Sequence, residues 1–308
     1  MKEFIIMADG TCDLDAATAE KYGIKIIPGH LVFPEQGDIP SFSEWTTVGR
    51  DEFYADLKKR PDEYATSPAN VEEFAAAMEP YAEQGDEILV MTISSGISGA
   101  FNFASRAAEQ VLKKYPEAKI EAVDTLRVGP GFGLMAIYAS QLREQGKTLS
   151  EVKEWLEANK NRFHQAGWLD DLSFVAKKGR LTHAKAFFGT LAGVKPIGEF
   201  DYNGLTTVLG KAKGAKKAYS LLLNYIAETI EDPEDQLIVI AQTNRLPQAE
   251  EYKRMIEEKF HPKAVVIRDV FPLCGVNIGP GLMAAYYVGK PISADLSEER
   301  AIVEKYAE

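Results

Sequence analysis

Three serines and two glycines fall within the short segment Ser94-Ser-Gly-Ile-Ser-Gly99. A serine hydroxyl can donate a hydrogen bond, and glycine lets the backbone approach a ligand closely. Where such a loop leads into a helix, backbone N–H groups and the positive end of the helix dipole favour a negatively charged group. The residue types in this segment therefore predict a site that binds an anion.

The segments on either side of this loop have the patterns of a strand and a helix. Residues 88–93 are a mostly apolar run, which is typical of a short buried strand. Within residues 101–112, apolar side chains recur at the spacing of one helical face. The loop is therefore expected at the carboxyl end of a strand and at the amino end of a helix.

Two other loops offer polar groups. Asp9-Gly-Thr-Cys-Asp13 follows the first predicted strand, and open α/β sheets bind ligands at the carboxyl ends of their strands. The same residues also suit a turn that caps the next helix. Ala65-Thr-Ser-Pro68 supplies two hydroxyls before a helix predicted from residue 71, where capping residues are equally common.

An enzyme that uses Ser98 or Asp9 is the alternative to a binding protein. Gly96-Ile-Ser-Gly-Ala100 approaches the G-x-S-x-G pattern of hydrolase nucleophiles, but it ends in alanine. A serine triad also needs a histidine, and none of the four histidines lies late in the chain beside a glycine-rich turn. These departures favour binding over a serine-dependent hydrolase or a phosphotransfer enzyme.

Neither a cofactor nor a metal site is predicted. Gly129-Pro-Gly-Phe-Gly133 is followed by Leu134 where a dinucleotide fingerprint has its third glycine, and no P-loop pattern occurs. Histidine, cysteine and acidic residues show no metal-ligand spacing. Cys12 and Cys274 are expected to be free thiols in a reducing compartment.

The composition is that of a globular protein with an acidic balance. The chain has 308 residues, of which 45% are hydrophobic, and a formal net charge of −11. This charge argues against a nucleic-acid partner. No apolar run is long enough to span a membrane, and the N-terminus does not read as a signal peptide. A cytoplasmic protein without stable membrane insertion is therefore expected.

Alternating strands and helices predict an α/β fold with two domains. The first, residues 1–163, is expected to be a wound parallel sheet covered by helices. The second, residues 164–308, is expected to add a hairpin at Asn203-Gly204 to further α/β units. The predicted strands are residues 4–8, 24–31, 88–93, 120–123, 194–200, 205–209, 237–241 and 264–269. The predicted helices are residues 16–22, 51–59, 71–84, 100–114, 133–145, 151–162, 184–191, 214–229 and 247–259.

Two loops of the second half also carry groups suited to an anion. Lys177-Lys-Gly-Arg180 is basic within an acidic chain, so it is either a solvated loop or a source of positive charge for a carboxylate or an acidic partner. Gly275-Val-Asn-Ile-Gly-Pro-Gly281 precedes the apolar stretch 282–288. That stretch is expected to be a helix, with the polar loop at its entrance.

Taken in order, these segments resemble the DegV family of bacterial fatty-acid-binding proteins. The resemblance covers nearly the whole chain and rests on Asp9-Gly-Thr-Cys-Asp-Leu14, Thr66-Ser67, Ile93-Ser-Ser-Gly-Ile-Ser-Gly99, Val123-Asp-Thr125, Lys177-Lys-Gly-Arg180, Val194-Lys-Pro196 and Gly279-Pro-Gly281.

The family resemblance implies a DegV-like fold with an acyl chain enclosed in a lipid tunnel between or beside the two domains. It implies that Thr66 and Ser98 bind the carboxylate, with Gly99, Arg180 and Asn277 at the same site. Burial contributes about 0.8 kcal/mol per methylene, so a chain of some 16 carbons gains on the order of 10 kcal/mol before binding costs. Candidates for the acyl-chain lining, although ordinary core is the favoured interpretation of each one taken singly, are Phe101, Phe132, Phe187, Phe188 and Met283.

The resemblance further implies a non-catalytic carrier with no cofactor, which binds palmitate-, stearate- or oleate-like acids and presents them to a separate fatty acid kinase. Some residues depart from the family pattern. Gly10 replaces a serine, Ala100-Phe101 replaces Thr-Tyr, and Asn277 stands where histidine is usual. Asparagine donates a hydrogen bond but does not titrate. These departures favour fatty-acid binding over partnership with a kinase.

Overall fold

The computed structural model describes residues 3–45, 48–181 and 193–307. They form two compact units, each assembled from separate stretches of the chain. The first unit comprises Met1–Thr46, Asp62–Lys160 and Phe271–Cys274, and the second comprises Thr47–Pro61, Asn161–Val270 and Gly275–Glu308. Residues 47–61, 161–163 and 271–274 thus group with the unit other than the one expected from their place in the sequence.

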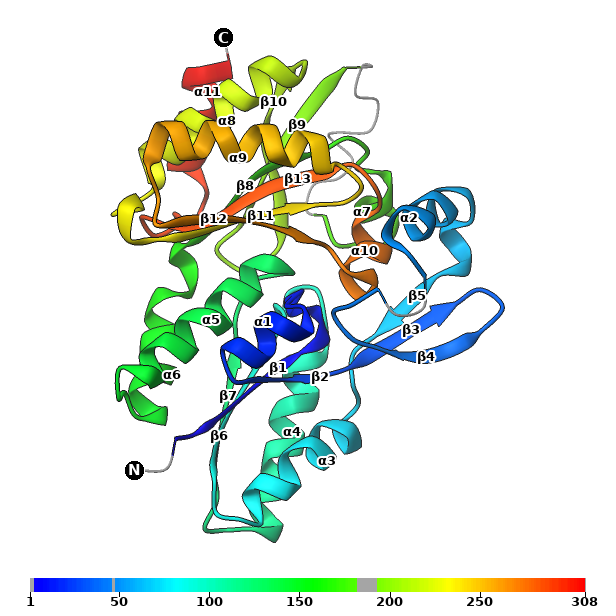
Figure 1. The fold of residues 1–308 in the computed structure, drawn as a ribbon, viewed down its shortest axis with the longest axis vertical. Helices are drawn as coiled ribbons and strands as arrows, with labels where there is room; N and C mark the ends of the chain where they lie inside the picture. The colour runs from blue at the N-terminus through cyan, green and yellow to red at the C-terminus, as the bar shows by residue number, and fades with distance from the viewer. Residues whose placement is uncertain (1–2, 46–47, 182–192, 308) are drawn as a thin grey trace. The chain divides into compact units, whose positions relative to one another are not determined.

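A parallel sheet forms the centre of the first unit (Figure 1). In the described residues it has four strands in the order β2-β1-β6-β7, and each neighbouring pair is parallel. Residues 88–92 of β6 are all buried, which is the pattern of a strand covered on both faces. This sheet confirms the wound α/β arrangement predicted for the first part of the chain. Its strands are β1 (Ile5–Asp9), β2 (Ile24–Ile27), β6 (Glu87–Thr92) and β7 (Lys119–Asp124).

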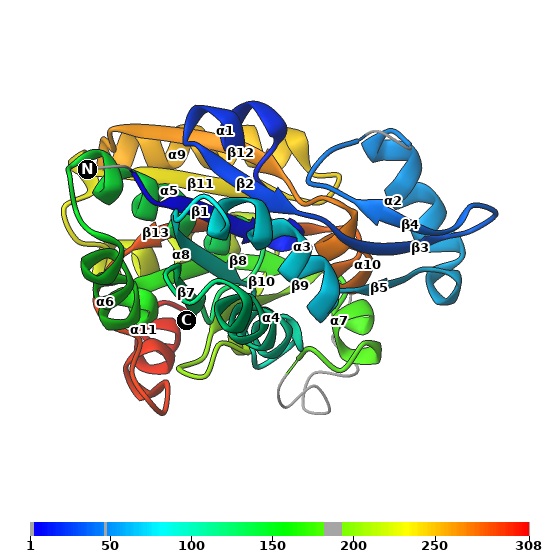
Figure 2. The same cartoon turned by 90° about the horizontal axis from the view of Figure 1, so that it is seen from below.

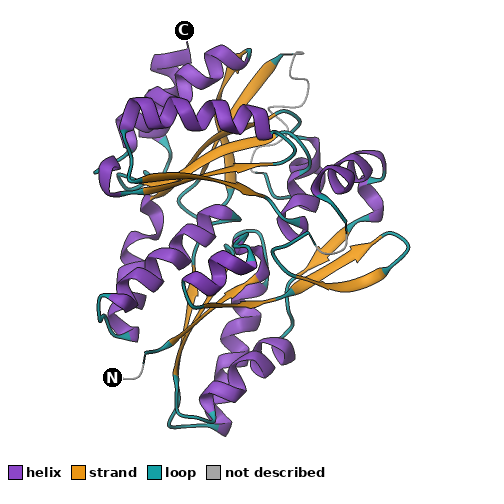
Figure 3. Cartoon of the chain, viewed as in Figure 1, coloured by secondary structure: helices purple, strands orange, loops and turns teal. Residues whose placement is uncertain are grey.

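Helices cover both faces of this sheet. α3 and α4 pack together on one face, and α5 and α6 lie on the other (Figures 1 and 3). Asn70 begins α3 with a capping box, in which its side chain and Glu73 each bond the other's backbone N–H. The helices of the unit are α1 (Ala16–Lys21), α3 (Val71–Ala82), α4 (Ala100–Lys114), α5 (Pro130–Glu144) and α6 (Leu149–Asn159).

The start of α6 was predicted wrongly. Its N-cap is Thr148, whose side chain accepts a hydrogen bond from the Glu151 backbone, while Glu151 bonds back to the Thr148 N–H. The sequence prediction began this helix at residue 151 and so missed the capping box. Ser150 and Thr148 are both good capping residues, but only Thr148 has a glutamate three residues later.

The glycine-rich segment before α5 serves helix packing. Pro130 occupies the first turn, where its missing N–H has no cost, so the helix begins three residues before the predicted residue 133. A Cβ atom at Gly133 would lie 2.3 Å from the Cys12 carbonyl oxygen. Gly133 therefore permits a close approach of α5 to residues 10–12, which explains the glycine without a dinucleotide.

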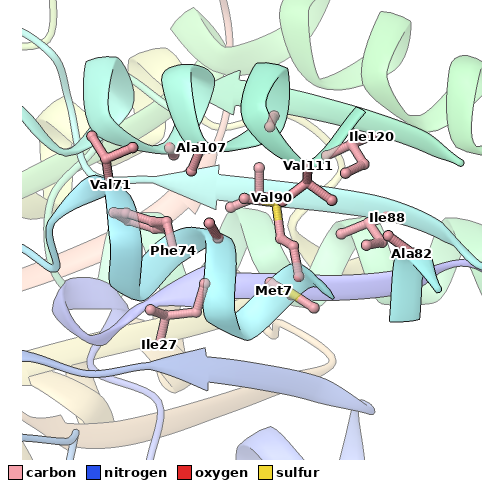
Figure 4. Packing of buried hydrophobic residues seen from close by; sticks show 14 of the residues in the cluster. Met7, Ile27, Val71, Phe74, Ala82, Ile88, Val90, Ala107, Val111 and Ile120 are labelled. Carbon is pink, nitrogen blue, oxygen red and sulfur yellow. The ribbon is translucent and has the colours of Figure 1, made fainter. Parts of the chain in front are cut away.

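Buried side chains from α3, α4 and the sheet form the hydrophobic core of this unit (Figure 4). Phe74 and Met78 of α3 have no exposed surface, and Ala104 and Ala107 of α4 are likewise fully buried. The small alanine side chains let α4 approach the sheet closely. This core fixes both helices against the strands.

A small antiparallel sheet completes the first unit. Its strands β3 (Gly29–Phe33), β4 (Gly37–Ser41) and β5 (Ala65–Ser67) lie side by side, with β3 in the middle (Figures 1 and 2). The sequence predicted one extended stretch over residues 24–31, which the structure divides into β2 and β3 at Pro28. Proline has no N–H to donate to a sheet, which accounts for the break.

The second unit is built on a mixed sheet. In the described residues it has six strands in the order β10-β9-β8-β13-β11-β12, in which only β11 and β12 pair in parallel. The predicted hairpin at Asn203-Gly204 is confirmed, since Phe200 pairs with Thr206 across it. The strands are β8 (Phe163–Leu169), β9 (Val194–Phe200), β10 (Thr206–Lys213), β11 (Leu237–Gln242), β12 (Ala264–Asp269) and β13 (Leu282–Val288).

The prediction of a helix over residues 282–288 was wrong, because these residues form β13. Every residue of β13 is buried, and the strand lies between β8 and β11. A short continuous apolar run suits a buried helix and a buried strand equally. β8 was not predicted at all, because His164 and Gln165 interrupt its apolar run, although both are buried.

The helices α8, α9 and α11 contact the strands of this sheet and pack in part on one another (Figures 1 and 2). The predicted helix 184–191 lies outside the described residues. No helix of the described segments is long and apolar enough to cross a membrane. The helices of the second unit are α2 (Arg50–Lys59), α7 (Ser173–Lys177), α8 (Ala215–Thr229), α9 (Leu246–Phe260) and α11 (Ser297–Ala307), and α10 (Pro272–Ile278) includes residues of both units.

Candidate functional site

Thr66 and Ser98 both precede helices that begin at one edge of the parallel sheet. β6 runs through the serine loop into α4, so α4 begins at the carboxyl edge. α3 leads directly into β6, so it ends at the amino edge and begins at the carboxyl edge as well. Thr66 lies on β5 just before α3, and Ser98 lies just before α4. Both side chains are half-buried.

The first half of the serine loop is held by its neighbours. Its backbone N–H groups donate in turn to three oxygens of adjacent segments: Ile93 to Asp9 Oδ2 (2.8 Å), Ser94 to the Arg127 carbonyl (3.0 Å) and Ser95 to Asp124 Oδ1 (3.0 Å). Asp9 and Asp124 are the last residues of β1 and β7, the two neighbours of β6, and Arg127 follows β7. The loop is therefore fixed by the strands on either side of it.

The second half of the loop closes on Ser94. The Gly96 N–H donates to Ser94 Oγ at 3.1 Å, and the N–H groups of Ile97 and Ser98 donate to the Ser94 carbonyl at 3.2 Å. The expectation that the backbone of this loop converges on a ligand was therefore wrong for residues 93–98, whose N–H groups bond within the protein. Spacing alone could not reveal this, because it does not show where each N–H points.

The Ser98 hydroxyl and the start of α4 remain suited to an anion. Ser98 Oγ accepts a hydrogen bond from the Ala100 N–H at 3.2 Å, and a hydroxyl that accepts keeps its own proton for another acceptor. Gly99, the N-cap residue of α4, is exposed and has no side chain that could cap the helix. A hydroxyl donor and the positive end of a helix dipole therefore lie together.

Asp9 has a structural role. Its side chain is 4% exposed, and Oδ1 accepts hydrogen bonds from both the backbone N–H and the hydroxyl of Thr11. Oδ2 accepts from Ile93. Burial raises the pKa of Asp9, and these hydrogen bonds oppose the rise. Because both oxygens are engaged, the geometry speaks against Asp9 as a nucleophile.

Two described histidines are bonded to carboxylates. His30 Nε2 lies 2.9 Å from Glu73 Oε1, and this hydrogen bond raises the pKa of His30. His164 Nδ1 lies 2.8 Å from Glu199 Oε2 in the second unit. Within the described part of the chain, neither bonds to Ser98, and His183 lies outside it. The serine-hydrolase alternative therefore gains no support from these two residues.

Arg180 and Asn277 belong to the second unit. Arg180 follows α7, and its guanidinium donates to the Lys178 carbonyl. Asn277 lies near the end of α10 and is half-buried. The backbone after Asn277 is well fixed, because the Gly279 N–H donates to the Gly275 carbonyl at 2.7 Å.

Gly279 and Gly281 both have positive φ angles, +76° and +105°, which side chains rarely tolerate. The Gly281 N–H donates to the Thr243 carbonyl at 2.9 Å. The Gly-Pro-Gly segment is therefore a sharp turn between α10 and β13 that carries the chain directly into the sheet.

The candidate lining residues fall into three groups. Phe132 on α5 and Met283 on β13 are buried, with 0% and 1% exposure, as ordinary core residues would be. Phe101 on α4 is half-buried. Phe187 and Phe188 lie outside the described residues. Their assignment to an acyl chain stays a prediction.

Fold and loops together define a two-unit α/β protein with a hydroxyl-bearing loop at the start of a helix, and this chain belongs to the DegV family. Residues 3–290 match the model of that family, which is described as one of uncharacterised proteins. A DegV domain-containing protein of Clostridium perfringens is 31% identical over 291 residues, which are 94% of this chain and 98% of the relative.

Solved structures of DegV family proteins share the fold. One is a fatty-acid-binding DegV family protein from Thermus thermophilus. It has a TM-score of 0.83 at 22% identity, covering 94% of this chain and all of that one. A protein from Eubacterium eligens, loaded with heptadecanoic acid, has a TM-score of 0.80 at 21% identity, covering 93% of this chain and all of the other.

Proposed function

We propose that this protein is a cytoplasmic carrier that binds a long-chain fatty acid without transforming it. The observation that carries the proposal is the Ser98 hydroxyl at the start of α4, which accepts from Ala100 and keeps its proton for a carboxylate. Thr66, on β5 before α3, is the second donor. Arg180, Asn277 and Gly99 complete the proposed carboxylate site.

The chemistry of a fatty acid fits these groups better than that of a small anion. Hydrogen bonds to a charged group contribute about 1.5–3 kcal/mol each, which orients the head group. Each buried methylene adds about 0.8 kcal/mol, so the chain provides most of the affinity. The heptadecanoic acid in the Eubacterium eligens protein supports a long-chain acid of similar length as ligand.

Native mass spectrometry of protein purified from a bacterial host tests the carrier against the enzyme. A bound mass that matches a fatty acid, together with no turnover of ester substrates, is expected. The proposal fails if the purified protein carries no fatty acid, binds no added oleate and cleaves esters in a Ser98-dependent manner. That result would identify a hydrolase.

Ser98→Ala is expected to weaken oleate binding about ten- to a hundred-fold, because one hydrogen bond to a charged group is lost. Thr66→Val should act similarly, since it keeps the shape and removes the hydroxyl. Affinity is measured by displacement of a fluorescent fatty acid. Ser105→Ala is the matched control, because Ser105 lies on α4 beyond its first turn. If both site variants bind like the control, the carboxylate site is assigned wrongly.

Asn277→His is expected to introduce a pH dependence of binding between pH 6 and 8. Histidine titrates near pH 6.5, so its charged form at lower pH would attract the carboxylate and its neutral form would not. Affinity should therefore fall as pH rises in the variant and stay nearly flat in the parent. The same titration of Asn203→His, in the β9–β10 turn, is the control. Equal profiles in both variants would place Asn277 away from the ligand.

Presentation of the bound acid to a separate fatty acid kinase is the partnership that the family resemblance suggests. It requires the carboxylate to be reached by a second protein. Incubation of the oleate-loaded protein with a bacterial fatty acid kinase and ATP would yield acyl phosphate if the two proteins cooperate. Absence of that product with an active kinase would limit the function to binding.

A further inference from the structure

Asp124 joins the serine loop to the loop that follows β7. Its Oδ1 accepts hydrogen bonds from the backbone N–H groups of Ser95 (3.0 Å) and Leu126 (3.2 Å). The residue is only 9% exposed. A single carboxylate oxygen thus connects two loops at the carboxyl edge of the sheet.

The serine loop depends on such bonds for its shape. Ser95, Gly96 and Gly99 are exposed, so little side-chain packing orders this turn. Glycine also has more conformational freedom to lose than any other residue. Hydrogen bonds must therefore hold the turn that presents Ser98: those of residues 96–98 to Ser94, and those that fix residues 93–95 to the neighbouring segments.

The other side of the connection is rigid. The N–H and hydroxyl of Thr125 both donate to the Thr92 carbonyl, at 3.2 and 2.7 Å. Leu126 has a φ of +51°, a conformation that is costly for a branched side chain and that the Asp124 bond helps to hold. Asp124 therefore transmits a fixed geometry from this loop to Ser95.

We propose that Asp124 is a positioning residue for carboxylate recognition, which acts through the serine loop to orient Ser98. This inference rests on the proposed function. Ordering the loop before the ligand arrives spares the binding step the cost of ordering it. A carboxylate side chain suits this role, because one of its oxygens can accept from both backbone N–H groups at once.

The test compares oleate with oleyl alcohol, which shares the chain and lacks the carboxylate. Asp124→Ala is expected to weaken oleate binding about tenfold and to leave oleyl alcohol nearly unchanged, so the ratio of the two affinities falls about tenfold. Asp124→Asn, which keeps one acceptor oxygen and the size, should lower the ratio by a smaller factor. Asp86→Ala is the control. Asp86 is also a buried aspartate, but it precedes the amino end of β6, whereas the serine loop follows the carboxyl end.

A purely structural role would reduce both affinities by one factor and leave the ratio unchanged, and that result would overturn the inference. If Asp124→Ala does not fold, the ratio measured for Asp124→Asn decides, and a ratio equal to that of the parent rejects the role. Ser98→Ala distinguishes a failure of the positioning role from a failure of the proposed carboxylate site. A lower ratio in Ser98→Ala with an unchanged ratio in the Asp124 variants refutes the positioning role alone, whereas unchanged ratios in all variants refute the proposed site.

Discussion

Glu199→Ala is expected to destabilise the second unit by about 3–5 kcal/mol, because it removes the acceptor of a buried hydrogen-bonded pair and leaves the buried partner unpaired. Glu199 and His164 are 0% and 1% exposed, and His164 Nδ1 lies 2.8 Å from Glu199 Oε2. His164 Nε2 lies 2.7 Å from the Lys290 carbonyl, which can only accept, so this nitrogen carries a proton.

The rest of the Glu199 carboxylate is equally engaged. Oε1 accepts from the backbone N–H groups of Gln165 and Phe200, each at 2.7 Å, and Oε2 also accepts from the Tyr225 hydroxyl at 2.9 Å. Burial raises the pKa of Tyr225 well above its ordinary value, which keeps that hydroxyl a donor. Removal of Glu199 therefore leaves several buried donors without an acceptor, each at a cost of about 1–3 kcal/mol.

Urea unfolding followed by Trp168 fluorescence measures this loss. Trp168 is buried on β8, beside His164 in sequence and 5.0 Å from the Tyr219 ring, so it reports on this unit. The other two tryptophans are replaced by phenylalanine. Glu231→Ala is the control, because Glu231 pairs with Arg162 at the surface, where such pairs contribute about 0–1 kcal/mol. Equal losses in both variants would contradict a special role for the buried network.

The sequence predicted those elements whose signals are local. The Asn203-Gly204 turn, the long amphipathic helix α4 and the alternation that gives the parallel sheet all follow from period and turn chemistry. β8 and β13 could not be assigned this way. β8 carries His164, whose burial depends on Glu199, a residue far away in sequence, and β13 is a short apolar run whose state depends on its neighbours β8 and β11.

The same distinction separates the parts of the candidate site. Ser98 could be predicted, because a serine between a buried strand and a helix is a local pattern. That the N–H groups of residues 93–95 are occupied could not, because their acceptors come from Asp9, Arg127 and Asp124 on adjacent segments. Which backbone donors remain available depends on which strands are neighbours in the sheet. A single sequence does not show which strands are neighbours.

Phe74→Ala is expected to destabilise the first unit by about 3–5 kcal/mol, because a fully buried ring is lost and a cavity remains. Phe74 has no exposed surface and lies in the core between α3, α4 and the sheet (Figure 4). Trp155, stacked on Tyr138 at 5.8 Å in this unit, reports the unfolding when the other tryptophans are replaced. Phe42→Ala is the control, because Phe42 is 43% exposed and should change stability by less than about 1 kcal/mol.

The core around Phe74 also connects stability to the site, since it fixes the helices that begin beside Thr66 and Ser98. A ligand that binds only the folded state stabilises it by about 2.7 kcal/mol at a free concentration of 100 Kd. Oleate should therefore raise the urea midpoint of the parent and of Phe42→Ala equally. If the cavity in Phe74→Ala loosens the starts of α3 and α4, the rise at the same oleate concentration will be smaller in that variant. An equal rise in all three proteins would show that the site does not depend on this core.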